Sequence, residues 1–505
     1  MSEKVVFLFG AGAEVPYGLP NGGEFALEIF RLIGEEDKIS LRDEIKKVNP
    51  ASHQAAWFPK DYPKNRIHVF GKTNFDSIIS STLEMKRDIV IYTLLNFDDI
   101  ANKVKKEFAN LNIDIDRVLT NMGCEPGSVQ YGSLLILNER LNNANTSSFF
   151  GSDYFSVLAQ LIKDKKFTGD CYQDASILAR SFIEILVGAL GKDLVHSLNN
   201  KLFDSAPDDL PFLDDIGGIF NVDYKKVGLD ALTFILNKPP FTKRKENIAT
   251  NIPEQQIAIE FYLRIAESIY SNFVDYQSLI DSHYRYLYQP AKEWAKFCKI
   301  ATFLFSVHRY VKKLCQTISK SKTDGYYDDI AACKKIEIIA IGTTNYTNLV
   351  KRIHADNIYF LNGSLDLYYD PYRNEIGNED NKKFQVPFLF TQSGIKPMTS
   401  IRMSEQYIEF YNKCRNADRL IVLGYGFNSD DGHINTLIRS LVDSKPGKRI
   451  EVVAFKENNI SSRKSQIEKN IRCDNRNSIH VYSVDEKRKI GGKHWLDVLF
   501  PAEEE

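Results

Sequence analysis

The feature that most constrains the fold is a short apolar run near the N-terminus that leads directly into a glycine-rich turn. Residues Val5 to Phe9 are all apolar, and Gly-Ala-Gly-Ala follows at positions 10–13. An unbroken apolar run of this length is typical of a parallel strand that is covered on both faces, because a strand with one wet face would alternate apolar and polar residues. The N-terminus therefore predicts the first strand of a parallel α/β sheet.

The last third of the chain contains further short apolar runs, several of which end at a glycine or a polar residue. They lie at residues 336–341, 358–361, 388–390, 420–423, 450–455 and 479–482. Helical patterns separate several of these runs, and strands that alternate with helices indicate a parallel sheet.

Between about residues 85 and 325 the apolar residues recur at helical spacing instead. Residues 257–269 have a wide apolar face and a narrow polar stripe of Glu260, Arg264 and Glu267, which predicts a largely buried helix. Lys238-Pro239-Pro240 and the charged stretch after it break the helical pattern and predict a loop.

We therefore expect an α/β fold in which a Rossmann-like parallel sheet is assembled from both chain ends and carries a large α-helical insertion. The expected boundaries are residues 1–84 for the first part of the Rossmann-like domain, 85–325 for the insertion and 326–505 for the second part. An unstructured excursion of that length would be implausible in a compact protein.

Composition narrows the choice of partners and compartment. The 65 Lys and Arg nearly balance the 66 Asp and Glu, so the basic excess that a dedicated nucleic-acid binder needs is absent and we expect no direct nucleic-acid partner. The seven cysteines are scattered without a C-x-x-C pair, which argues against a zinc ribbon and a disulfide framework. The N-terminal apolar run is too short for a signal peptide or a membrane span. We expect a cytoplasmic protein with no membrane partner and no zinc.

Four polar or glycine-rich motifs follow predicted strands. The turn at residues 10–13 has the small side chains that let a backbone approach a pyrophosphate. Such turns are also glycine-rich for packing reasons alone. Gly-Leu-Pro at 18–20 makes the interpretation as a phosphate-binding loop more specific. Thr-Thr-Asn at 343–345 can equally cap a helix, and Asn-Gly-Ser at 362–364 can equally form a plain turn. Gly-Tyr-Gly at 424–426 is the fourth motif.

Taken together and in this order, the motifs resemble the sirtuin family, and most closely its bacterial sirtuin-like branch, whose members cleave NAD in antiphage defence. Residues 10–13 with 18–20 match the family's phosphate loop, and residues 343–345 match its Thr-x-Asn motif. Residues 424–426 are similar to its Gly-x-Ser segment near the adenosine half of NAD, and the Asp-rich stretch that ends at residues 433–435 is typical of the bacterial branch. The resemblance covers both chain ends and not the central insertion.

Three departures from the family pattern bear on the chemistry. The family's catalytic His precedes a Gly, and here that position is Asn362, which is not a useful proton acceptor. The residue two after the family Asn is normally Asp, and here it is Thr347. The zinc-binding cysteine pairs of the deacetylase branch are missing, which argues against a protein deacylase.

The resemblance implies an NAD hydrolase that forms nicotinamide and ADP-ribose and depletes NAD in abortive infection. NAD is then the substrate, and no other cofactor is expected. The alternative is a catalytically silent sensor of NAD or ADP-ribose that regulates a defence complex, and a pure interaction protein is a third hypothesis. We also expect a homo-oligomer, a second defence protein as partner, or both.

The residues expected to act in this site follow from the motifs. Asn345, which in the family contacts the nicotinamide ribose and orders the attacking water, and Asn362 are the predicted catalytic residues. The residues predicted to bind NAD are Gly10, Ala11, Gly12, Ala13, Glu14, Pro20, Thr343, Thr344, Asn345, Gly363, Ser364, Gly424, Tyr425 and Gly426. The candidates for a general base elsewhere in the sequence are Asp366, Asp430, Asp431 and His433.

Overall fold

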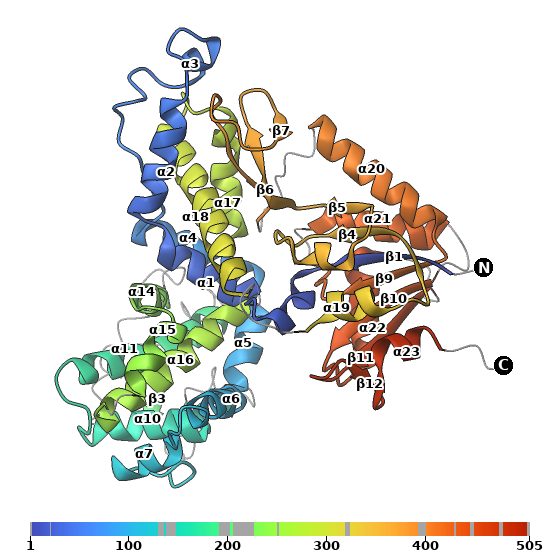
Figure 1. Ribbon diagram of the computed structural model, residues 1–505. Helices are drawn as coiled ribbons and strands as arrows, with labels where there is room; N and C mark the ends of the chain where they lie inside the picture. The colour runs from blue at the N-terminus through green and yellow to red at the C-terminus, as the bar shows by residue number, and fades with distance from the viewer. Residues whose placement is uncertain are drawn as a thin grey trace. The chain divides into compact units, whose positions relative to one another are not determined.

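The computed structural model describes residues 3–20, 22–129, 136–137, 148–190, 203–205, 227–249, 252–318, 324–391, 400–428, 431–444, 449–473 and 478–501 (Figure 1). The chain divides into two compact units. The sheet unit comprises residues 1–21, 32–69 and 280–505, and the helical unit comprises residues 22–31 and 70–279. None of the helices in the described part of the chain combines the length and the apolar composition needed to cross a bilayer.

The sheet unit is built on a six-stranded sheet in which every pairing is parallel. Its strands are β1 (Lys4–Phe9), β4 (Glu337–Thr343), β5 (Ile358–Phe360), β9 (Arg419–Leu423), β10 (Arg449–Phe455) and β11 (Ile479–Val484). Their spatial order is β11-β10-β9-β1-β4-β5. Read along the chain, this is the Rossmann order 3-2-1-4-5-6, so the predicted α/β fold with a sheet drawn from both chain ends is confirmed.

Strand β1 lies at the centre of the sheet, which explains its unbroken apolar sequence. Val6 and Leu8 contribute to one core, whereas Val5, Phe7 and Phe9 contribute to the core on the opposite face. The first core is covered by α20 (Ile401–Asn416), α21 (Gly432–Ser444) and α22 (Ile460–Ile471), and the second by α19 (Tyr326–Ala332) and α23 (Trp495–Leu499).

One predicted strand does not join the parallel sheet. The run at 388–390 overlaps the end of β8 (Val386–Leu389), which pairs antiparallel with β6 (Gly363–Asp370); β6 also pairs with β7 (Glu375–Gly377). All four residues of β8 are buried, so its apolar character reports burial and carries no information about the direction of its partner. A small antiparallel hairpin, β12 (Lys489–Ile490) and β13 (Lys493–His494), also belongs to this unit.

Further helices of the sheet unit come partly from residues 32–69, inside the expected first part of the Rossmann-like domain, and partly from residues 280–318, which we expected in the insertion. They are α2 (Glu35–Lys46), α3 (His53–Trp57), α18 (Trp294–Ile318) and the short η5 (Arg285–Tyr288), and α17 (Gln277–Tyr284) crosses the boundary at residue 280. Residues 280–325, predicted as part of the insertion, belong to this unit because α18 packs against α2 and β8.

The helical unit gathers helices from α1 to α16. They are α1 (Gly22–Leu32), α4 (Lys72–Met85), α5 (Arg87–Leu95), α6 (Phe97–Ala109), α7 (Ile115–Asn121), α10 (Asp153–Lys163), α11 (Asp170–Leu190), α14 (Leu229–Asn237), α15 (Phe241–Ile248) and α16 (Glu254–Phe273). A short antiparallel pair, β2 (Ile136–Leu137) and β3 (Phe203–Ser205), is also present. Residues 22–31 and 70–84, which we had expected in the Rossmann-like domain, lie here because the ring of Phe30 packs against Phe70, Phe75 and Tyr276.

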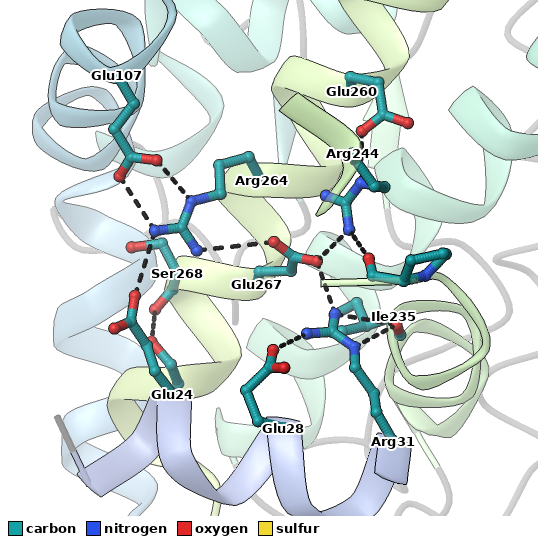
Figure 2. Close-up of polar contacts among 12 residues, drawn as sticks. Glu24, Glu28, Arg31, Glu107, Ile235, Arg244, Glu260, Arg264, Glu267 and Ser268 are labelled. Carbon is teal, nitrogen blue, oxygen red and sulfur yellow. Dashed lines mark hydrogen bonds and ion pairs between the residues drawn. The ribbon is translucent and has the colours of Figure 1, made fainter. Parts of the chain in front are cut away.

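Helix α16 is the buried helix that its sequence predicts, and its polar stripe forms an ion network inside the helical unit (Figure 2). Glu267, whose side chain is 3% exposed, accepts from Arg31 at 2.6 Å and from Arg244 at 2.7 Å. Arg244 also binds Glu260 at 2.6 Å. The loop prediction was correct for residues 238–240, which lie between α14 and α15, and wrong for the charged stretch after them. That stretch is helix α15 with Pro240 as its N-cap, and its Arg244 points inward to Glu260 and Glu267.

Candidate active site

The four sequence motifs converge at the carboxyl ends of β9, β1, β4 and β5, which are neighbours in the sheet. In a sheet of this order the crevice for a ligand lies where the chain reverses direction across the sheet, between β1 and β9. The motif loops after these two strands meet there.

The loop after β1 needs its glycines because the loop after β9 packs closely against it. The amides of Gly10 and Gly12 donate to the carbonyls of Leu423 and Gly424, each at 2.9 Å. A Cβ on Gly12 would lie 2.8 Å from the Gly424 Cα, and Gly424 itself has φ +65° with the Ala13 nitrogen 2.0 Å from the position of its Cβ. Only glycine permits this approach, so packing alone requires these residues.

The same loop keeps a small exposed face for a ligand. Ala11 and Gly12 are exposed, and of the amides of residues 10–14 that of Ala11 finds no acceptor among the residues that the structure describes. The loop continues into two 3-10 turns, Ala11–Ala13 and Val15–Tyr17, and α1 begins only at Gly22, after the half-buried Pro20. The glycine-rich turn therefore does not lead directly into an α-helix. A phosphate here would contact loop backbone rather than the end of a helix dipole.

Asn345 lies in the loop after β4 with its amide group held by the protein. Its Nδ2 donates to the Gly10 carbonyl at 3.0 Å and to the Tyr327 hydroxyl at 3.2 Å, and its backbone amide donates to Thr343 Oγ1 at 3.0 Å. Thr344 ties the loop to β1 through its amide, which donates to the Phe9 carbonyl at 2.9 Å. Both amide hydrogens of Asn345 are thus used internally, and its Oδ1 is the atom left to accept from a substrate hydroxyl.

Glu14 is buried directly beside Asn345. Its Oε1 accepts from the Thr347 hydroxyl at 2.6 Å and from the Tyr327 hydroxyl at 3.0 Å. Burial raises the pKa of Glu14 to about 7, although the hydrogen bonds from Thr347, Tyr327 and Asn345 each act to lower it. Sequence reasoning placed Glu14 only as a member of the loop and missed Tyr327 entirely. The signal that was available is an acidic residue directly after Gly-Ala-Gly-Ala.

Asn362 lies at the end of β5 in a second polar cluster. Its Nδ2 donates to Asp431 Oδ1 at 3.3 Å, and its Oδ1 lies 3.3 Å from His433 Nε2. The ring of Tyr407 packs edge-on against His433 with centroids 5.4 Å apart, and the Tyr407 hydroxyl donates to the Leu361 carbonyl at 2.5 Å. The Asn362 side chain is therefore engaged with an acid and an imidazole at the start of α21.

The other candidates for a general base lie elsewhere. Asp366 is exposed on β6 and pairs with Lys351 at 3.2 Å; its pKa is lowered, because the hydrogen bonds from Asn348 and Lys351 outweigh its desolvation. Asp430 lies outside the described residues. Of the four candidates, the structure therefore brings Asp431 and His433 to Asn362.

The two loops that carry the predicted catalytic residues are joined by backbone hydrogen bonds. Leu361 donates to the Thr343 carbonyl at 2.8 Å, and Leu365 donates to the Tyr346 carbonyl at 2.9 Å. Gly363 has φ +89°, and its Cβ position lies 2.0 Å from the Phe388 carbonyl oxygen, so only glycine fits there. The neighbouring Ser364 is 3% exposed.

Tyr425 was predicted to bind NAD, but its side chain is not available for contact with a ligand. Its ring is 5% exposed in the core beneath α20 and α21, and its hydroxyl donates to Asn435 Oδ1 at 2.9 Å. A nucleotide at this loop would meet the backbone of Tyr425 and the exposed Gly426, not the tyrosine ring.

A hollow of about 330 Å³ lies elsewhere on the sheet unit, along α2. Three of its four cations have partners: Lys38 binds Glu35, Lys46 binds Asp43, and Arg42 donates to the carbonyls of Pro63 and Asn65. Because most of its cations are already paired, this hollow is a weaker candidate for a nucleotide site than the strand ends.

Comparison of the chain with protein-family models, with curated proteins and with solved structures found no match.

Proposed function

We propose that this protein is an NAD hydrolase that cleaves NAD to nicotinamide and ADP-ribose. The observation that carries the proposal is Asn345, whose amide is anchored to the Gly10 carbonyl at the carboxyl ends of β1 and β4. With both hydrogens of its amide engaged, Asn345 Oδ1 is the atom that, in this proposal, accepts from a ribose hydroxyl or from an ordered water.

The chemistry needs orientation more than a strong base. The C1′–N bond of NAD breaks, its electron pair neutralises the pyridinium nitrogen, and nicotinamide leaves. Water then attacks the oxocarbenium-like C1′, and its proton is released to yield ADP-ribose. Because the cation is a strong electrophile, a positioned water and fixed dipoles are the main requirements. Asn345 supplies the dipole, while Asn362 with Asp431 and His433 forms a polar wall from β5 and α21 that can receive the proton.

We place this activity in bacterial antiphage defence, where NAD depletion halts the infected cell. Unrestrained hydrolysis would poison the host, so the proposal includes a quiet basal state that is released in a homo-oligomer or by a second defence protein.

The test is NAD consumption by purified Asn345→Ala protein. Losing one oriented polar contact in such a site costs on the order of a hundredfold in rate. Asn357→Ala is a matched control, since its Nδ2 bonds the Ile339 carbonyl at 3.1 Å directly before β5, away from the motif loops. A folded Asn345→Ala protein with the wild-type rate contradicts the proposal.

The alternative is a silent sensor that binds NAD or ADP-ribose without turnover. It is favoured by one observation, namely that Asn362 replaces the family's catalytic His and is itself held by Asp431. Binding of NAD to wild-type protein with no nicotinamide release, under every activating condition, would select this alternative.

A further inference from the structure

We propose that Glu14 and Tyr327 form a hydrogen-bond relay that holds the Asn345 side chain in its working orientation, with Glu14 as the buried acid that sets the direction of the relay. The inference rests on the proposed function and adds two positioning residues, neither of which needs to touch the substrate.

The direction of the relay follows from counting donors. An ionised carboxylate only accepts, so the single hydrogen of the Tyr327 hydroxyl points to Glu14 Oε1, 3.0 Å away. The Tyr327 oxygen is then free to accept from Asn345 Nδ2 at 3.2 Å, while the second amide hydrogen of Asn345 goes to the Gly10 carbonyl at 3.0 Å. Flipping the amide would set Oδ1 against the Gly10 oxygen. The relay therefore keeps Oδ1 on the side that faces away from Gly10 and Tyr327.

Protonation of Glu14 disturbs this order. A neutral carboxyl can donate to the Tyr327 oxygen, and the Tyr327 hydrogen then competes with the Asn345 amide for the same space. The hydrogen bond from Asn345 Nδ2 to the Tyr327 hydroxyl therefore weakens, although no residue has moved.

Glu14 also stands in for an acid that the sequence lacks. In the family that the motifs resemble, position 347 is an Asp, whereas here the Thr347 hydroxyl donates to Glu14 Oε1 at 2.6 Å. The carboxylate is thus supplied from the loop after β1 rather than from the loop after β4, within one hydrogen bond of position 347.

The surroundings of Glu14 support a proton equilibrium near neutrality. It is 2% exposed, and burial raises its pKa to about 7. The groups that face it are Tyr327 from α19, Thr347 and Asn345 from the loop after β4, and Cys315 from α18, whose own pKa is raised by burial and, less, by Glu14. Activity should therefore fall as the pH drops through about 7.

The test compares Tyr327→Phe and Glu14→Gln with wild type, and uses Tyr326→Phe as the matched control. Tyr327→Phe keeps the ring that packs against Phe9 and Tyr17 and removes only the hydroxyl. Tyr326 is the adjacent buried tyrosine of α19, and its ring packs against Trp495 instead. We expect kcat to fall about tenfold in Tyr327→Phe, the cost of one hydrogen bond, with KM nearly unchanged. We expect the activity of Glu14→Gln no longer to fall as the pH drops through about 7. Tyr326→Phe should match wild type in kcat, KM and pH profile.

The outcomes separate the relay from the activity itself. If wild type cleaves NAD and Tyr327→Phe has the same kcat and the same pH profile, the relay is overturned while the hydrolase stands. If wild type cleaves no NAD, the hydrolase proposal fails, and ADP-ribose affinity at pH 6 and pH 8 becomes the readout. Weaker binding by Tyr327→Phe at pH 8 then supports the relay, and equal affinities at both pH values overturn it.

Discussion

Replacing Glu14 by Gln should stabilise the sheet unit at pH 8 while it impairs the site. The reason is that Glu14 is buried, and burial raises its pKa from 4.5 to about 7 despite three hydrogen bonds that act in the opposite direction. A carboxyl whose folded pKa is raised contributes stability that is fully present below its unfolded pKa and is lost as the pH rises through the folded value.

The magnitude follows from the shift. A difference of about 2.5 pKa units corresponds to about 3 kcal/mol between the protonated and ionised forms, at about 1.4 kcal/mol per unit. Because the side chain is almost fully buried, solvent screening takes little from this figure. Below pH 4.5 wild type and Glu14→Gln should therefore be about equally stable, and Glu14→Gln should gain over the window from pH 4.5 to 7 until it leads by about 3 kcal/mol.

Urea unfolding followed by tryptophan fluorescence measures this directly. The three tryptophans, Trp57, Trp294 and Trp495, all belong to the sheet unit, so the signal reports the unit that contains Glu14. Taking the difference between the two proteins cancels the other titrating groups. A difference in unfolding free energy that stays flat between pH 4.5 and 8, or that favours wild type at pH 8, would refute the reasoning about the buried carboxyl.

Two further predictions concern other parts of the molecule. Glu267→Ala should destabilise the helical unit by about 3–5 kcal/mol, because it removes a buried partner from Arg31 and Arg244. The control, Asp174→Ala, breaks only the more exposed pair with Lys238 and should cost about 1 kcal/mol or less. Both effects are measured as shifts of the urea unfolding midpoint followed by circular dichroism. NAD consumption at fixed enzyme concentration should be low for the isolated protein and should rise with a co-encoded partner or phage components, whereas full, concentration-independent activity of the monomer contradicts the gated state.

The sheet was predictable because its central strands are buried on both faces. Strands β1 and β9 have no exposed residue between Val5 and Phe9 or between Leu420 and Leu423. A strand that is buried at every residue requires a continuous apolar run in the sequence. The same logic misplaced β8, which is buried in an antiparallel sheet. Helix α1 shows the matching limit for helices: an amphipathic pattern tells that one face is buried, but not which unit buries it.

The site was predictable only as far as its backbone motifs. Strand-end loops could be located from local sequence, and the structure brings them together at one edge of the sheet. The side-chain partners could not be found in this way, because they join residues far apart in the chain. Tyr327 reaches Glu14 across 313 positions, and Asp431 reaches Asn362 across 69. A seven-residue helix such as α19 carries no motif that would single out its second tyrosine.

Glu14 is the residue at which local rules and the fold disagree most. A buried carboxyl opposes folding when ionised, and a Gln of similar shape would fill the same space without that cost. Natural sequences break such rules mainly where a site needs the group, and strongly shifted pKa values gather at functional sites for the same reason. The buried acid lies one hydrogen bond from Tyr327 and two from Asn345, within the loop that we expect to hold the nucleotide. Its position in the fold is thus accounted for by what it does to Asn345 rather than by what it adds to stability.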